Sequence, residues 1–205
     1  MIALVDYGAG NLTSVRKAFT AIGASVWTPS VPGELARAHG IVIPGVGHFD
    51  STRALTKEWR HAIKWEVENR LPVLGICVGL QWLFSGSDEA PDVEGLDLFK
   101  GTCFKLSSSS PKSPGPLKVP HVGWNSLEVT ASSGLMQGIE SGTQVYFTHS
   151  YAAPVTENTV ATCEYGGRFS AAVQYGHLAA VQFHPEKSGE AGLRILSNWL
   201  GWAKP

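Results

Sequence analysis

The strongest constraint on the fold is a regular alternation of strand-like and helix-like segments over residues 1–84. Short β-type runs at 2–5, 25–27, 41–43 and 71–74 alternate with segments in which large apolar residues recur every three or four positions. The run Ile41–Ile43 is entirely apolar, as expected of a parallel strand that is covered on both faces. This alternation predicts a parallel sheet with helices on both sides.

The helical segments are expected at 12–22, at 33–39, where the signal is weak, and from residue 51 onwards. Asn11 or Thr13 can cap the first helix, and Gly23 ends it. From about Gly101 the helical periods fade, and strands are expected at 126–130, 144–147, 159–165, 171–175 and 178–183. A last helix follows, capped by Ser188. Residues 107–116, rich in Ser and Pro, are expected to form a mobile connector without a function of its own.

The predicted fold class is therefore α/β. An open, mostly parallel central sheet with helices on both faces carries an antiparallel or mixed β extension in its C-terminal half. A length of 205 residues is typical of one domain, expected to span 1–205.

Composition excludes several classes of function. The net charge of −1 gives no basis for binding nucleic acid or an anionic membrane through bulk electrostatics, and no apolar run approaches 18 residues. Residues 1–6 lack the basic start of a signal peptide and are expected to form a strand. The three cysteines are odd in number and widely spaced, which favours neither disulfides nor a zinc site. We therefore expect a cytoplasmic protein without a metal.

The residue most indicative of chemistry is Cys77, which follows the strand-like run at 71–74. The pattern Gly-x-Cys-x-Gly over residues 75–79 is typical of a nucleophile elbow, where two glycines let strand and helix approach closely around a strained residue. Such a turn is expected to leave the sulfur exposed at its tip. The ordinary alternative is a small buried hydrophobe, because free cysteines are usually buried. The motif therefore needs partners elsewhere in the chain.

The leading candidate for a base is His184, which follows an apolar strand and precedes Pro185. We expect it to be exposed at the strand end. Glu186 lies two residues on, and extended backbone would place both side chains on the same side. The carboxylate could then orient one imidazole nitrogen while the other faces Cys77. The remaining histidines outside the motifs are interpreted as structural: His39, His48, His61 and His177.

Two further turns are rich in glycine. The turn at 44–47 can direct backbone N–H groups at an anion or change its peptide orientation at low cost, although most Pro-Gly pairs are plain turns. The turn at 6–12 lacks a complete Gly-x-Gly-x-x-Gly, and no acidic residue follows about 20 positions later. Nucleotide binding is therefore rejected, and no cofactor is expected.

Taken together, these motifs resemble those of the class I (triad-type) glutamine amidotransferases. More narrowly, they resemble the glutaminase subunits of imidazole glycerol phosphate synthase, in histidine biosynthesis. The matching segments follow the family's order along nearly the whole chain: 6–12, 44–47, 75–81, 119–125, 146–151 and 182–188. Each motif has modest specificity, but their joint order is highly specific.

The resemblance implies a role for each matching residue. Cys77 would be the nucleophile, His184 the acid and base, and Glu186 the group that orients the imidazole. The oxyanion hole would be formed by backbone N–H groups of Val78, which the elbow geometry also predicts, and of the loop residues Val46 and Gly47. Contacts with the substrate glutamine are implied for Gly45, Gly47, Gln81, His149 and Ser150.

The resemblance also implies a partner. In the family, ammonia crosses the interior of a (β/α)₈ cyclase barrel to reach a second active site, and this chain carries no such barrel. A separate cyclase subunit is therefore expected, forming a heterodimer. From the residue pattern alone, Trp124 fits a core or an interface equally well, and the resemblance favours the interface. The candidate docking residues are Asn11, Pro120, His121, Gly123, Trp124, Asn125 and Lys187.

Three alternatives remain at this stage. The chain could be the glutaminase of another amidotransferase pathway, although the segments 6–12 and 120–125 argue against it. It could be a free-standing cysteine hydrolase of γ-glutamyl or peptide bonds, which would turn over without a partner. A non-catalytic relative is disfavoured by the intact Cys77, His184 and Glu186.

Overall fold

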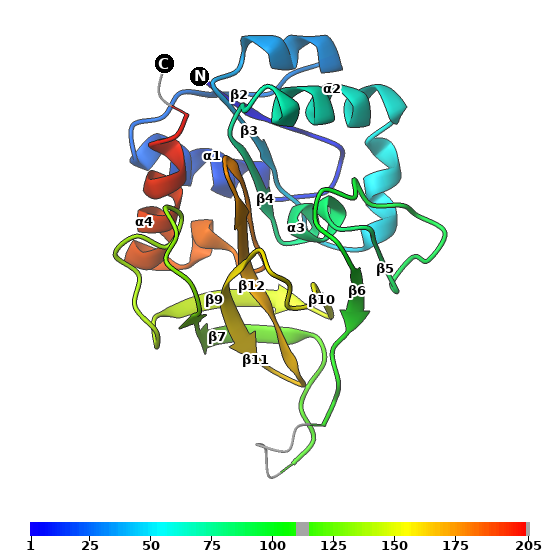
Figure 1. Cartoon of the computed structure of the whole chain (residues 1–205), viewed down its shortest axis with the longest axis vertical. Helices are drawn as coiled ribbons and strands as arrows, with labels where there is room; N and C mark the ends of the chain where they lie inside the picture. The colour runs from blue at the N-terminus through cyan, green and yellow to red at the C-terminus, as the bar shows by residue number, and fades with distance from the viewer. Residues whose placement is uncertain (110–114, 204–205) are drawn as a thin grey trace.

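A computed structural model describes residues 1–109 and 115–203 (Figure 1). Part of the predicted connector at 107–116 therefore lies outside the described residues. The central sheet has eight strands in the order β2-β1-β3-β4-β13-β12-β11-β8. Five of them are parallel: β2 (Val26–Trp27), β1 (Ile2–Leu4), β3 (Gly40–Ile43), β4 (Val73–Ile76) and β13 (Leu178–Val181). The remaining three are antiparallel: β12 (Arg168–Tyr175), β11 (Thr159–Glu164) and β8 (Glu128–Val129).

Helices cover both faces of the sheet, as predicted (Figure 1). One face carries α1 (Leu12–Ala21) and α4 (Gly189–Leu200), which meet where Phe19 and Trp199 pack edge to face at 5.7 Å. The other face carries α2 (Lys57–Glu68) and α3 (Val78–Leu83). The weak helix expected at 33–39 is a 3-10 turn, η1 (Pro32–Arg37), and a second, η2 (Phe49–Ala54), precedes α2.

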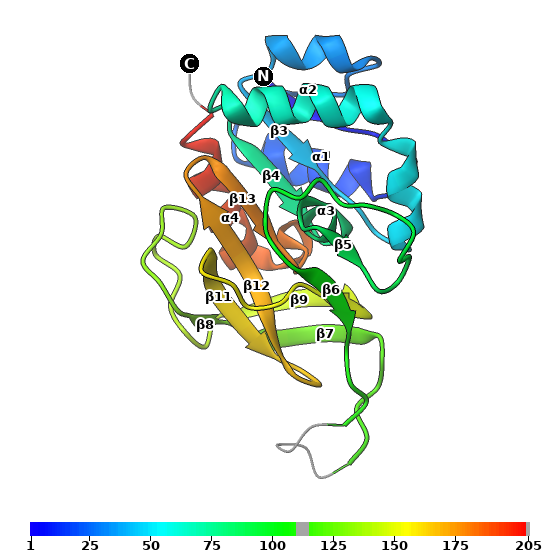
Figure 2. The ribbon, with the colours of Figure 1, turned by 45° about the vertical axis from the view of Figure 1, so that its right-hand side comes forward.

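Two smaller sheets lie beside the antiparallel half of the central sheet (Figure 2). One pairs β7 (His121–Ser126) with β9 (Gln144–His149), and the other joins β10 (Tyr151–Ala152), β6 (Thr102–Lys105) and β5 (Gly86–Ser87). The strand predicted at 126–130 is misplaced, because the chain forms β7 before it and the two-residue β8 within it. A strand of two residues, such as β8, is too short for a periodic pattern to reveal it.

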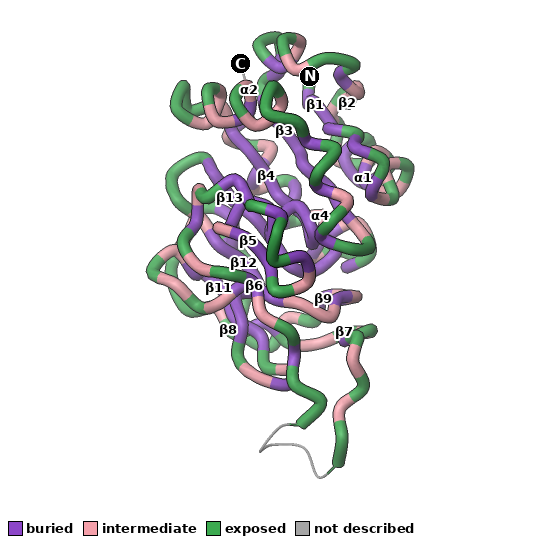
Figure 3. The backbone as a smooth tube through the Cα atoms, turned by 90° about the vertical axis from the view of Figure 1, so that its right-hand side faces the viewer, coloured by how far each residue is buried: buried purple, intermediate pink, exposed green. Residues whose placement is uncertain are grey.

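The innermost strands form the centre of the core (Figure 3). Every residue of β3, β4 and β13 is buried, which explains why their sequences are apolar without alternation. β4 and β13 are parallel neighbours with Ile76 opposite Val181. The residues that follow them, Cys77 and the segment 182–184, therefore leave the sheet side by side at the carboxyl ends of the strands, where open α/β sheets place their ligands.

Candidate active site

Cys77 occupies a strained turn between β4 and α3. Its φ of 54° and ψ of −108° lie in a region that non-glycine residues rarely adopt. A Cβ added at Gly79 would lie 1.9 Å from the carbonyl oxygen of Ile43, and one at Gly75 would lie 2.8 Å from that of Gly79. Only glycine fits at these two positions, so the predicted close approach of strand and helix is confirmed.

The sulfur of Cys77 is not exposed, contrary to the expectation from the elbow motif. The residue is 2% exposed, because the segment from Thr148 to Tyr151 covers it. The Sγ lies 3.8 Å from the carbonyl oxygen of Thr148, and the side-chain amide of Gln182 donates to it at 3.6 Å. Access to the thiol therefore runs through a small cavity rather than across an open surface.

His184 is also buried, at 1% exposure, so its predicted exposure is wrong. Its backbone N–H donates to the carbonyl of Tyr146 at 2.8 Å, which ties it to β9. Ser188 is the N-cap residue of α4, as expected, but its hydroxyl donates to the carbonyl of His184 at 2.6 Å and accepts from the N–H of Tyr146 at 3.0 Å instead of bonding the helix. These bonds fix the position of the imidazole before any substrate binds.

The predicted pairing of His184 with Glu186 is present, although for a different reason. The residues after His184 form a 3-10 turn, η3 (Pro185–Lys187), rather than extended backbone. Nδ1 of His184 donates to Oε1 of Glu186 at 2.8 Å, and both side chains are almost completely buried. A carboxylate bonded to Nδ1 leaves Nε2 free for a reacting group. Within residues 1–109 and 115–203, this Nε2 has no hydrogen-bond partner.

Electrostatics favour a charged imidazole at this position. Burial by itself lowers the pKa of His184, but the charge of the nearby Cys77 and the Glu186 carboxylate outweigh that effect. Together they raise the pKa of His184 to about 10. The imidazolium is thus stabilised between two negative groups, which suits a proton donor to a leaving amine.

A cavity of 190 Å³ opens onto Cys77. Five of the residues implied as oxyanion or substrate contacts line it: Gly47, Val78, Gln81, His149 and Ser150. Gly45 and Val46 do not, because Gly45 is buried against Tyr7 and Val78, and Val46 is half-buried next to it. Val78 is the first residue of α3, so its N–H has no partner within the helix and is free for an anion.

Gln81 and His149 form the polar wall of this cavity. Nε2 of Gln81 donates to the carbonyl of Tyr151 at 2.8 Å, and Nδ1 of His149 bonds the same oxygen at 2.9 Å. Oε1 of Gln81 is buried and finds no partner among the residues that the structure describes. An unsatisfied buried acceptor beside a cavity is a site for a ligand donor.

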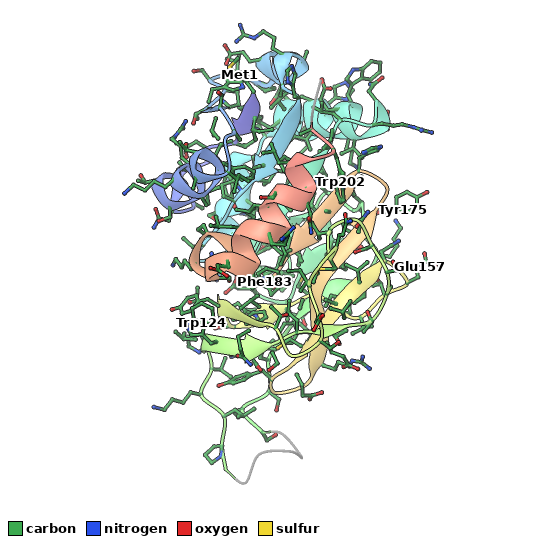
Figure 4. The ribbon with its side chains drawn as sticks, turned by 90° about the vertical axis from the view of Figure 1, so that its left-hand side faces the viewer. Met1, Trp124, Glu157, Tyr175, Phe183 and Trp202 are labelled. Carbon is green, nitrogen blue, oxygen red and sulfur yellow. The ribbon has the colours of Figure 1, made fainter. Side chains whose placement is uncertain are left out.

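The predicted docking residues mostly lie on the surface, around β7. Trp124 is 56% exposed, which excludes the core interpretation, and its ring centroid is 6.1 Å from that of Tyr146 (Figure 4). The ammonium of the exposed Lys187 lies 5.6 Å from the same tyrosine ring. Asn11 is exposed and caps α1. Pro120 is exposed and also lines the cavity. Gly123 and Asn125 are half-buried.

His121 is the exception among these docking candidates. It is 3% exposed and stacks on Tyr165, with ring centroids 3.9 Å apart. Its side chain is therefore unavailable for direct contact with another protein. The cause is the alternation of β7, in which His121 points inward while Val122 and Trp124 point outward.

Some site residues escaped the sequence analysis. Gln182 is fully buried and contacts Cys77, and its only sequence signal is a polar residue at the end of an apolar strand. Tyr7 is a second case, because burial and then the charge of Cys77 raise the pKa of its hydroxyl. Glu89 also lines the cavity, while its carboxylate accepts the N–H of Phe49 at 2.8 Å. Glu89 comes from the irregular segment after β5, where no pattern indicated a site.

Solved structures share this fold. PurLQS from Thermotoga maritima superimposes with a TM-score of 0.76 at 19% identity, covering 99% of this chain and 98% of that one. The glutaminase domain of Trypanosoma brucei CTPS, with bound acivicin, gives a TM-score of 0.62 at 18% identity over 98% and 93% of the two chains. At these identities the likeness concerns the fold alone.

Sequence relatives are much closer. The family model for glutamine amidotransferase class-I matches residues 3–201. The imidazole glycerol phosphate synthase subunit HisH of Moorella thermoacetica is 44% identical, over 97% of this chain and 93% of its own length. The protein of the same name from Methanothermobacter thermautotrophicus is 44% identical over 98% of both chains. The chain therefore belongs to the class-I glutamine amidotransferases and, within them, to the family of HisH subunits of imidazole glycerol phosphate synthase.

Proposed function

We propose that this chain hydrolyses glutamine to glutamate and ammonia with a triad of Cys77, His184 and Glu186. The observation that carries the proposal is the arrangement at the cavity. Cys77, in its strained turn, lines the cavity. The buried imidazole of His184 lies near it, and its Nδ1 is held by the Glu186 carboxylate at 2.8 Å. Nucleophile, base and orienting group in this order are the requirements for acyl transfer through a covalent intermediate.

In the first half of the reaction, the Cys77 thiolate attacks the carboxamide carbon of glutamine. The carbonyl oxygen becomes an oxyanion, for which the free N–H of Val78 is the first donor. A second donor comes from the loop at 44–47, where Gly47 lines the cavity with a φ of 102°. Gln81, His149 and Ser150 contact the remainder of the substrate.

Protons move through His184. Its imidazolium gives the Nε2 proton to the departing nitrogen, which leaves as ammonia, and a thioester remains on Cys77. The neutral imidazole then takes a proton from water as the water oxygen attacks the thioester carbon. Glutamate leaves, and the sulfur returns as thiolate. Glu186 stabilises the charged ring and holds its orientation throughout. Because the nucleophile has to remain a reduced thiol, a reducing compartment such as the cytoplasm suits the enzyme.

We further infer that the ammonia is used by a second polypeptide. The relatives are named as subunits of imidazole glycerol phosphate synthase, so this chain is one component of that enzyme of histidine biosynthesis. The proposed partner is a (β/α)₈ cyclase subunit, which would form imidazole glycerol phosphate and aminoimidazole carboxamide ribotide. Its docking face is proposed to be the surface around Trp124, Lys187 and Asn11. Among the described residues, no helix is long and apolar enough to cross a membrane.

The test compares glutamate release by the chain alone and by the chain with its cyclase and the cyclase ligand. Low activity alone and a sharp rise in the complex are expected, and full activity without the partner would favour a free-standing hydrolase. In the complex, Cys77→Ala should abolish synthesis from glutamine but leave synthesis from added ammonia. Loss of both would contradict the division of labour.

A further inference from the structure

The strand β7, whose outward face is proposed to dock, also carries the start of a buried row of hydrogen bonds. The amide nitrogen of Asn125 lies 3.4 Å from Nε2 of His121. Nδ1 of His121 lies 3.1 Å from Nε2 of His149, and Nδ1 of His149 lies 2.9 Å from the carbonyl oxygen of Tyr151. This row leads from strand β7 to the wall of the glutamine cavity.

The direction of these bonds follows from which atoms can donate. The carbonyl of Tyr151 only accepts, so Nδ1 of His149 carries a proton, and Nε2 of the neutral ring is an acceptor. Nδ1 of His121 must then be the donor, which leaves its Nε2 to accept from Asn125. Burial lowers the pKa of His121 to about 4 and that of His149 to about 3, so both rings are neutral near pH 7.

A second row continues from the same carbonyl to the nucleophile. The oxygen of Tyr151 also accepts from Nε2 of Gln81 at 2.8 Å. The other hydrogen of that nitrogen is directed at Oε1 of Gln182 at 3.3 Å, and Nε2 of Gln182 donates to the sulfur of Cys77 at 3.6 Å. We call the two rows together, from Asn125 to Cys77, the polar chain.

We propose that His121 is a positioning residue for glutamine hydrolysis: through the polar chain, it holds the cavity wall at Tyr151 and links the position of strand β7 to Cys77. The proposal rests on the function proposed above and adds a physical connection between docking surface and thiol. His121 touches neither the cavity nor the reacting atoms, and it acts through His149.

The geometry of β7 makes this link rigid. His121 is sandwiched between Tyr165, at 3.9 Å and 14° between ring planes, and Phe147, at 4.9 Å and 21°. The next outward residues, Val122 and Trp124, are large and exposed. Successive side chains of a strand point to opposite faces but share one backbone. A partner that shifts the strand through its outward side chains therefore also moves His121. The imidazole cannot turn away between its two stacked neighbours, so the shift is passed to His149.

Two substitutions separate the hydrogen bond from the packing. His121→Phe keeps a ring between Tyr165 and Phe147 but leaves Nε2 of His149 without a donor. His121→Asn loses the stacking but can place an amide N–H where the imidazole Nδ1–H lies. In the complex with cyclase, His121→Phe is expected to lower kcat/KM for glutamine about tenfold, because a buried acceptor is left unpaired. His121→Asn is expected to lower it less than about threefold, because the acceptor keeps a donor. Synthesis from added ammonia should be unchanged in both.

Thermal unfolding of both variants provides the control for a purely structural role. If activity followed melting temperature, so that His121→Asn were impaired as much as or more than His121→Phe, the proposal would be overturned. Equal activity of both variants and wild type would overturn it as well. These results leave the test of the triad untouched, because that test depends on Cys77→Ala, so the two proposals fail separately.

A measurement on the unaltered chain covers the case in which a variant does not fold. Nitrogen-15 NMR of the histidine rings, between pH 6 and 8, should show His121 and His149 protonated on Nδ1 and unprotonated on Nε2. The two rings can be assigned in the unaltered chain by correlating each imidazole with its own backbone resonances, so that no variant is needed. A proton on Nε2 of either ring would reverse the polar chain and contradict the proposal.

Discussion

Single residues of this site are buried more deeply than any residue pattern indicated. Cys77, His184 and Glu186 could be predicted from the elbow motif and from the spacing of a histidine and a carboxylate. The depth at which they lie could not, because it is created by the segment 148–151 and by strand β9, which are remote in sequence. Gln182 was missed for the same reason, since its role exists only once the two segments meet.

Glu186→Gln is expected to reduce glutamine hydrolysis by the complex by roughly 10²–10⁴. It should also lower the pKa of His184 from about 10, because the carboxylate is one of the groups that raise it. The imidazolium is the acid, and it is lost as pH rises through that pKa, so the alkaline fall in rate should move to lower pH. A pH–rate profile measures this, with the exposed Glu190→Gln as control. If the alkaline fall in rate occurred at the same pH in Glu186→Gln as in the wild type, the proposed role of Glu186 would be wrong.

Tyr7→Phe is expected to raise the free energy of unfolding by about 1 kcal/mol, because a buried hydroxyl without a partner is a net cost. The Tyr7 hydroxyl has no hydrogen-bond partner in the described ranges, 1–109 and 115–203. Urea denaturation checks this, with Tyr175→Phe as the matched control at a site that is 72% exposed. A loss of stability would mean that the hydroxyl has an acceptor.

At the scale of elements, the regular strands of the sheet could be predicted from the sequence, but its short and irregular strands could not. The predicted strands at 2–5, 41–43, 159–165 and 178–183 all overlap strands of the central sheet. The runs at 41–43 and 178–181 are entirely apolar because these strands are buried. β5 and β10 have two residues each, and their existence depends on pairing with distant segments. The alternation of β7 turns His121 inward, but the ring that it stacks on there, Tyr165, belongs to another segment of the chain.

Gly79→Ala should lower the free energy of unfolding by about 3 kcal/mol or more, because the new Cβ would overlap the backbone of β3 and force β3 and α3 apart. Urea denaturation of this variant and of Gly33→Ala gives the comparison. Gly33 has open space around its Cα and an ordinary φ, so its substitution should change stability by less than about 0.5 kcal/mol. Equal effects would show that the elbow tolerates a side chain.

For the whole molecule, the sequence predicted a central sheet between layers of helices, but it did not show which surfaces of the molecule remain exposed to solvent. Whether Trp124 is buried or exposed could not be settled from its neighbours in sequence. The pairing of β7 with β9 turns it outward, into an exposed group with Val122. Exposed aromatic residues beside a cation are typical anchors of protein interfaces, and Lys187 provides that cation over Tyr146.

Trp124→Ala is expected to weaken binding to the cyclase by about 2 kcal/mol, which is the typical loss of an aromatic anchor at an interface. Calorimetric titration with the cyclase measures it. Tyr175→Ala is the matched control, because Tyr175 is more exposed than Trp124 and lies on the opposite side of the molecule in the view of Figure 4. Equal losses for both variants, or none for Trp124→Ala, would place the docking face elsewhere.

The parallel pairing of β4 with β13 has a consequence for the timing of synthesis. Cys77 leaves the ribosome more than 100 residues before His184, its proposed base, because Gln182, which precedes that histidine, already lies 105 positions after Cys77. Until residues 178–181 emerge, β4 is an open edge with unpaired backbone groups, ready to pair with any other chain. The strand that closes this edge is the one that delivers His184. A growing or truncated polypeptide therefore carries Cys77 without its proposed acid, and the strand that closes the edge of the sheet also brings His184 to the thiol.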